Sequence, residues 1–125
     1  MKGRLLPLAG KTVDGREVMD EVPNTDSISA TLDDFDVMKG VRVIWMSDIE
    51  VTDPYKLFYA ADDIERVKEL ASLIDYNKKI SPLIVVIDDK GPYILEGGHR
   101  LGALHLLKAK AFPALVVLDV GSVSV

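Results

Sequence analysis

The chain has 125 residues, of which 48% are hydrophobic, with a formal net charge of -5 and a pI near 4.9. A chain of this size and composition predicts one domain with a hydrophobic core, and the acidic balance disfavours non-specific binding to nucleic acid. The absence of cysteine excludes a disulfide framework, a cysteine-based zinc site and a thiol nucleophile. Because no apolar run has the length of a signal-peptide core or a membrane span, we expect a cytoplasmic protein with no membrane association.

The first forty residues are expected to extend the main domain with a hairpin and a short helix. Two apolar segments, 5–8 and 16–19, surround Asp14-Gly15, which is a typical hairpin turn. The alternative for this segment is an arm that packs on a neighbouring subunit. Further along, Ile28, Leu32 and Phe35 fall on one face of a short helix. We assign residues 1–40 to this extension.

Residues 41–118 carry the stronger periodic signals. Apolar runs predict strands over 41–46, 83–87, 93–95 and 114–118, and amphipathic spacing predicts helices over 64–76 and 100–107. Residues 47–59 are expected to be irregular, with a turn at Asp53-Pro54. Together these elements predict an α+β fold, in which two helices pack on a small mixed sheet, followed by a tail over 119–125. The residues expected to be buried are Phe35, Trp45, Ile64, Val67, Leu70, Ile74, Val85, Leu104 and Val116.

One turn in this pattern is suited to an anion. The strand over 93–95 leads through Gly97 and Gly98 into a helix whose first residues include His99 and Arg100. The first N–H groups of a helix lack intrahelical acceptors and the helix dipole is positive there, so residues 98–101 would offer donors to a phosphate. Glycine lets the backbone approach closely, and the Arg100 guanidinium can donate two parallel hydrogen bonds.

The same stretch resembles a known family. Residues 96–104 are similar to the signature box of the ParB/sulfiredoxin superfamily, in which sulfiredoxins carry Gly-Gly-Cys-His-Arg and ParB proteins carry Gly-Glu-Arg-Arg. The flanking segments 80–86 and 111–117 resemble the strands on either side of that box. The resemblance covers residues 41–118. It implies a ParB/sulfiredoxin-like fold and a nucleoside triphosphate, ATP or CTP, bound with Mg²⁺ at the box.

Two departures from the family pattern limit what the resemblance implies. Gly98 occupies the position of the sulfiredoxin cysteine, and reduction of a sulfinic acid by that family requires the thiolate, so the chain is not an active sulfiredoxin. The second arginine of the ParB box is replaced by Leu101 or is absent, depending on the alignment, which departs from the ParB mode of CTP recognition.

The candidate site residues follow from the turn and the resemblance together. We expect the ligand to contact Gly97, Gly98, His99 and Arg100, joined by Lys79 and Ser81 from the segment before the 83–87 strand. Glu96 and His99 are the candidate catalytic groups, as base, Mg²⁺ ligand through water, or proton carrier. The structural alternatives are a salt bridge of Arg100 with Glu96 or a distant acid and a pair of Glu96 with Lys79. For the other two residues they are a helix-capping or core-satisfied His99 and a solvated Lys79. His105 is interpreted as structural, and no cluster of metal ligands is predicted.

Three functions remain open on the sequence alone. The first is a nucleotide-binding domain, an NTPase or phosphotransferase, whose partner is a nucleotide or another phosphate-bearing small molecule. The second is a DNA-associated ParB-like module, a nuclease or a partition component, which the acidic pI disfavours. The third is a non-catalytic regulatory or oligomerisation domain, and a homo-oligomer is compatible with all three.

Overall fold

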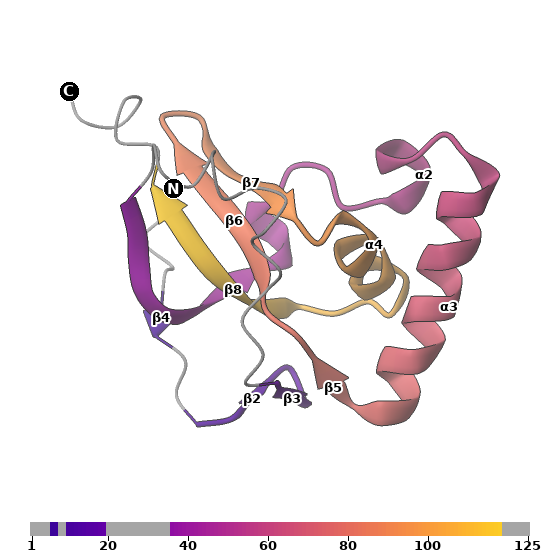
Figure 1. The fold of residues 1–125 in the computed structure, drawn as a ribbon, viewed down its shortest axis with the longest axis horizontal. Coiled ribbons are helices and arrows are strands. Elements are labelled where there is room, and N and C mark those ends of the chain that lie inside the picture. Colours follow the sequence, from indigo (N-terminus) through magenta and orange to yellow (C-terminus); the bar gives the residue numbers. More distant parts are fainter. Residues whose placement is uncertain (1–5, 8–9, 20–35, 119–125) are drawn as a thin grey trace.

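The computed structural model describes residues 6–7, 10–19 and 36–118. Its main sheet has five strands in the order β1-β4-β8-β6-β7. The helices α2, α3 and α4 lie to one side of this sheet, and a second sheet, β2-β3-β5, lies below it (Figure 1). The predicted α+β class is therefore confirmed. The strands of the main sheet are β1 Leu6–Pro7, β4 Asp36–Trp45, β6 Leu83–Asp88, β7 Gly91–Glu96 and β8 Ala111–Leu118.

The main sheet is mixed because the chain returns to it through a helix. β6 and β7 form an antiparallel pair, α4 (Gly98–Leu106) follows, and β8 then pairs parallel with β6, with Val85 beside Val116. A parallel neighbour requires such a crossover, whereas β4 pairs antiparallel with β8 on its other side. All four predicted strands are present, and β8 and β4 are each longer than the sequence indicated. The crossover places the start of α4 at the end of β7.

The residues expected to be irregular contain two short helices, so that expectation was wrong. The helix η1 covers Met46–Asp48, and α2 covers Pro54–Leu57. The Asp53 carboxylate accepts a hydrogen bond from the Tyr55 N–H at 2.9 Å, and proline occupies the first helical position, which is the usual chemistry of a helix start. The predicted Asp53-Pro54 turn is thus the cap of a helix.

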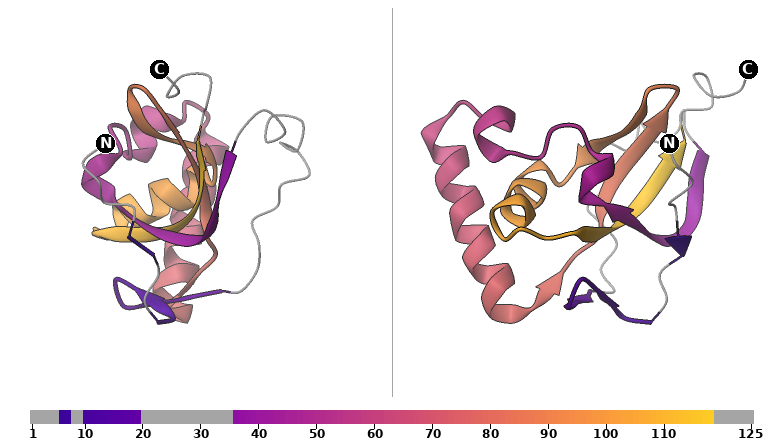
Figure 2. Two further views of the ribbon diagram at one scale, coloured as in Figure 1. Left: turned by 90° about the vertical axis from the view of Figure 1, so that its left-hand side faces the viewer. Right: turned by 180° about the vertical axis from the view of Figure 1, so that it is seen from behind.

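The long helix α3 covers Ala61–Asn77 and begins before the predicted residue Ile64. Asp62 and Asp63 therefore lie in its first turn, where carboxylates interact favourably with the helix dipole, instead of capping it. The helix ends at Lys78, whose backbone is left-handed with φ 55°. α3 packs against α4 and lies beside it at the edge of the molecule in the right view of Figure 2.

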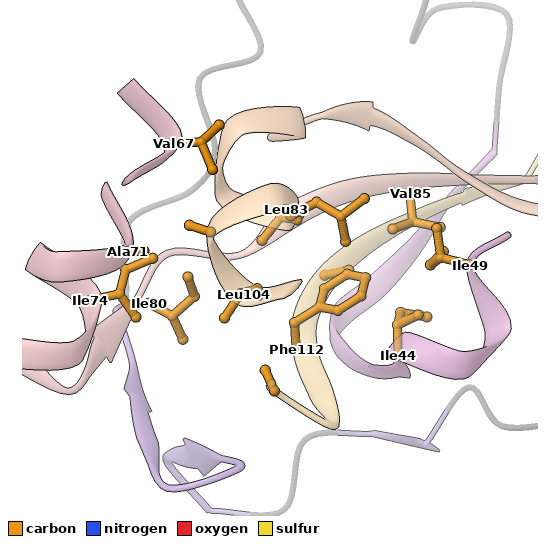
Figure 3. Packing of buried hydrophobic residues seen from close by; sticks show 14 of the residues in the cluster. Ile44, Ile49, Val67, Ala71, Ile74, Ile80, Leu83, Val85, Leu104 and Phe112 are labelled. Atoms are coloured by element: carbon orange, nitrogen blue, oxygen red, sulfur yellow. The ribbon is translucent and has the colours of Figure 1, made fainter. Parts of the chain in front are cut away.

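The principal core lies between the sheet and the helices α3 and α4 (Figure 3). β6 is buried on both faces: Leu83 and Val85 face the helices, while Ile84 and Val86 belong to a smaller cluster on the other face. Five residues of the expected core are buried, namely Val67, Ile74, Val85, Leu104 and Val116. Trp45, Ile64 and Leu70 are only partly buried, and Phe35 lies outside the described residues together with the predicted helix over 28–35 and the tail.

The predicted hairpin at Asp14-Gly15 is present with its second strand as expected, but its first strand is a different segment. β2 (Thr12–Val13) pairs antiparallel with β3 (Arg16–Val18), and β3 then pairs parallel with β5 (Lys79–Ile80). β1, which was expected in the hairpin, pairs with β4 instead. The Asp14 carboxylate also accepts a hydrogen bond from the Lys110 N–H at 2.8 Å. The hairpin therefore packs on its own chain.

The glycine at position 40 does not end the N-terminal extension. β4 runs through Gly40, which has φ 79°, and the register shifts between Val37 and Val41 as at a β-bulge. This irregularity lies within one continuous strand. The division of the chain at residues 40 and 41 stays a prediction, although β4 crosses it.

Candidate functional site

The turn between β7 and α4 depends on a glycine with no room for a side chain. Gly97 has φ 105°, and a Cβ atom there would lie 2.8 Å from Cγ of Leu83 and 3.3 Å from an Arg100 nitrogen. At Gly98 a Cβ would approach only the Phe58 ring, at 3.4 Å, which is an ordinary contact distance. Gly97 is therefore required by the fold, whereas the space at Gly98 would admit a methyl group against the Phe58 ring.

The start of α4 supplies N–H groups, though fewer than expected. The Leu101 N–H donates to the Gly97 carbonyl at 2.8 Å, which is the first bond of the helix. The helix offers no acceptor to the N–H groups that precede it. Of the N–H groups expected to serve a ligand at residues 98–101, those of Gly98, His99 and Arg100 therefore remain.

Arg100 holds the connection between β5 and β6. Its Nη1 donates to the carbonyls of Ser81 and Pro82, both at 2.9 Å. Burial lowers the pKa of Arg100, and the nearby Glu96 carboxylate offsets part of this shift. An arginine guanidinium remains charged at neutral pH. The expected alternative, an Arg100–Glu96 salt bridge, does not form among the described residues. Arg100 is therefore partly structural, through a contact that the sequence did not indicate.

His99 is held by two residues that the sequence reasoning missed. Its Nε2 lies 2.9 Å from Oδ1 of Asp63, in the first turn of α3. Its ring stacks on Phe58, with ring centroids 4.4 Å apart and planes inclined by 12°. The Asp63 carboxylate holds one ring nitrogen of His99, and the Phe58 ring restrains the plane of the imidazole. No spacing rule could find these partners, because 36 residues separate Asp63 from His99.

A cleft of about 610 Å³ opens beside the start of α4. Five predicted site residues line it, from Glu96 to Arg100, and the opposite wall is one face of α3. That face consists of Arg66, Glu69, Leu70 and Leu73, whose spacing of three and four residues puts them on one side of the helix. The sequence analysis assigned this face of the helix no place in a site.

The other two predicted binding residues lie in an adjoining cleft. Lys79 and Ser81 line a hollow of about 370 Å³ together with Asn77 and Met19. Arg100, Leu70 and Leu73 line both hollows, so the two clefts meet along α3. The Ser81 hydroxyl lies 3.5 Å from Sδ of Met19. The structure thus joins the predicted residues into one extended surface but separates Lys79 and Ser81 from the glycine turn.

The charges around the main cleft are balanced. Arg66 and Arg100 are opposed by Glu69 and Glu96, while Phe58 contributes apolar surface. Arg66 and Glu69 are exposed and form no ion pair with a described residue. No group of three or more metal-ligating side chains exists within the described part of the chain. Two carboxylates beside the cleft would suit Mg²⁺ only if phosphate oxygens and water completed its coordination.

His105 lies apart from this cleft. Its Nδ1 is 2.8 Å from the Thr52 hydroxyl, which links α4 to the segment before α2. This contact agrees with the interpretation of His105 as structural.

Comparison with known proteins concerns the fold. The chain matches no protein-family model and no curated protein. A crystal structure of sulfiredoxin from Arabidopsis thaliana is similar, with 22% sequence identity and a TM-score of 0.48 over 61% of this chain and 82% of that chain. The likeness concerns the backbone arrangement and says nothing of what this chain binds. No helix within the described ranges has the length and apolarity to cross a membrane.

Proposed function

We propose that the chain binds a phosphate-bearing small molecule, a nucleoside triphosphate such as ATP or CTP, in the main cleft. The observation that carries the proposal is that the start of α4 and an exposed cation, Arg66, line the same cleft. A phosphate beside the N–H groups of Gly98 to Arg100 would meet the positive end of the helix dipole. Gly98, His99 and Arg100 all line this cleft.

Arg66 is the better candidate for the mobile cation of the site. Arg100 already donates two hydrogen bonds to backbone carbonyls, so a ligand would receive only its remaining N–H groups. Arg66 has no such commitment to a described residue and is exposed. Since a guanidinium donates to phosphate in pairs of parallel bonds, Arg66 would close over a phosphate held at the turn.

Chemistry on the ligand would fall to Glu96 and His99, with Mg²⁺ carried in by the phosphates. Glu96 would hold the ion directly or through water, and Glu69 would be its counterpart on α3. His99 would contact a phosphate or a reacting hydroxyl. Phosphoryl transfer depends mainly on positioning and charge stabilisation, so few groups suffice for an NTPase or phosphotransferase.

Titration with ATP, CTP and pyrophosphate, with and without Mg²⁺, tests the proposal. Binding measured by calorimetry should weaken in Arg66→Ala and persist in Lys68→Ala, which removes a cation from the same helix outside the cleft lining. A ligand present at 100 times its Kd should raise the free energy of unfolding by about 2.7 kcal/mol. If no compound binds at millimolar concentration, the nucleotide proposal fails.

One observation favours a second candidate, a regulatory domain that binds without turnover. The Arg100 guanidinium, which the sequence reserved for a ligand, is engaged in the fold through Ser81 and Pro82. Release of phosphate from bound ATP or CTP, measured over hours at saturating nucleotide, separates the two candidates. Turnover that is lost in Glu96→Gln supports an enzyme, and binding with no release supports the regulatory domain.

A further inference from the structure

The contact between α3 and α4 determines which nitrogen of His99 carries a proton. An ionised carboxylate only accepts hydrogen bonds, so the 2.9 Å contact between Asp63 Oδ1 and His99 Nε2 requires a proton on Nε2. In the neutral ring the other nitrogen, Nδ1, then carries a lone pair and can only accept. The stacked Phe58 ring, 4.4 Å away, restrains the plane in which that lone pair points.

We propose that Asp63 is a positioning residue that holds neutral His99 as the Nε2–H tautomer, so that Nδ1 accepts a hydrogen bond from the ligand. The ligand class is then a phosphate compound that also carries a hydroxyl or N–H group. A fully ionised phosphoryl group carries only acceptor oxygens and offers no such donor to Nδ1. The proposal rests on the proposed function for the identity of the cleft, but the tautomer itself is independent of any ligand.

Three features make this arrangement more than a surface ion pair. Asp63 and His99 are each partly buried, with 40% and 34% of their side chains exposed, which limits competition from water. The two residues come from the first turns of different helices, so the contact is fixed by the packing of α3 on α4. Only His99 of this pair lines the cleft, so Asp63 acts through the imidazole.

The first test measures the tautomer without any ligand. The chain has 2 histidines, so ¹⁵N-labelled histidine gives two ring systems, and His105→Gln assigns them. Wild-type His99 at a pH where the ring is neutral should show the Nε2–H form, and Asp63→Ala should convert it to a mixture of both tautomers. Asp62→Ala is the matched control, since it removes the neighbouring carboxylate from the same helical turn. Equal tautomer populations in wild type and Asp63→Ala would overturn the proposal.

The second test compares two phosphate esters of similar size, glycerol 3-phosphate and n-propyl phosphate. Only the first brings hydroxyl donors, and one additional hydrogen bond should make its binding about fivefold tighter. That preference should disappear in Asp63→Ala and remain in Asp62→Ala, whereas a preference unaffected by Asp63→Ala would contradict the assigned role. If neither ester binds wild type, the phosphate site fails, and the ligand-free tautomer measurement still decides the role of Asp63.

Discussion

The two walls of the main cleft differ in how firmly the fold engages them. On the α4 wall, Gly97 packs against Leu83 and Arg100 donates to backbone carbonyls of the β5–β6 connection. On the α3 wall, Arg66 and Glu69 are exposed and carry no described ion pair. The α4 wall, which carries the sequence box, is therefore largely structural. The α3 wall, which has no such motif, carries the charged side chains that are more accessible to a ligand.

This difference teaches that a motif can mark a site without supplying all its chemistry. A tight turn next to a buried strand demands particular residues for packing reasons, and those residues give the motif its distinctive spacing. The opposite wall has only to present side chains of suitable charge on one face of a helix. Substitutions on the two walls should consequently affect different quantities, stability on α4 and binding on α3.

The largest effect is expected from Gly97→Ala. An alanine would adopt an unfavourable left-handed backbone and place its Cβ against Leu83, which together should cost roughly 2–5 kcal/mol of unfolding free energy. Gly98→Ala is the matched control and should change stability by less than about 0.5 kcal/mol, because its Cβ meets only an ordinary contact. Urea denaturation measures both. Equal losses of unfolding free energy in the two variants would show that the two glycines do not differ in how tightly they are packed.

Arg100→Ala should also destabilise the fold, by about 2–3 kcal/mol. It removes charge-assisted hydrogen bonds to the Ser81 and Pro82 carbonyls and leaves these acceptors without the guanidinium. Arg100→Lys should recover part of the loss, since an ammonium keeps the charge but not the planar fork. If urea denaturation gave an unfolding free energy within about 0.5 kcal/mol of wild type, Arg100 would serve ligand binding alone.

Arg66→Ala should have the opposite profile. We expect the free energy of binding to ATP or pyrophosphate to weaken by roughly 1 kcal/mol, since an exposed guanidinium is hydrated before it meets phosphate. The unfolding free energy should stay within about 0.5 kcal/mol of wild type. Calorimetry and urea denaturation of the same preparation measure both quantities. A stability loss with unchanged affinity would show that the α3 wall is structural too.

Glu69→Gln should give the smallest effect, and its sign should depend on Mg²⁺. Without the ion, removing a carboxylate that repels phosphate should tighten pyrophosphate binding by about 0.5 kcal/mol. With Mg²⁺, the same substitution should weaken binding if Glu69 contributes to the ion's coordination. Glu65→Gln is the control from the same helix, outside the cleft lining and paired with Lys68 at 3.7 Å. An effect of one sign under both conditions would exclude Glu69 from a metal role.

The long apolar elements of the fold could be predicted from the sequence because their periodicity is local. The buried run of β6 and the stripe of α3 are visible in this way. The short elements α2 and β5 were not predicted. A strand of 2 residues such as β5 exists only through its pairing with β3, which no local pattern reveals.

The candidate site was predictable on one wall only. Residues 96–100 are contiguous, so their convergence at the turn follows from the chain itself. Asp63 and Phe58 reach His99 through the packing of α2 and α3 on α4, which no local pattern encodes. Arg66 and Glu69 have the composition of any solvated helical face, and only the structure assigns them to a cleft.

The hydrogen bond from the Lys110 N–H to the Asp14 carboxylate closes a loop of exceptional length. The two residues are 96 positions apart, so forming the contact costs loop-closure entropy. We therefore expect it to form late in folding. The hydrogen bond is also exposed, so it can break while the core stays folded. The Lys110 amide should therefore exchange its hydrogen faster than the amides of β6, and its protection would report, at a single atom, whether the N-terminal hairpin is docked.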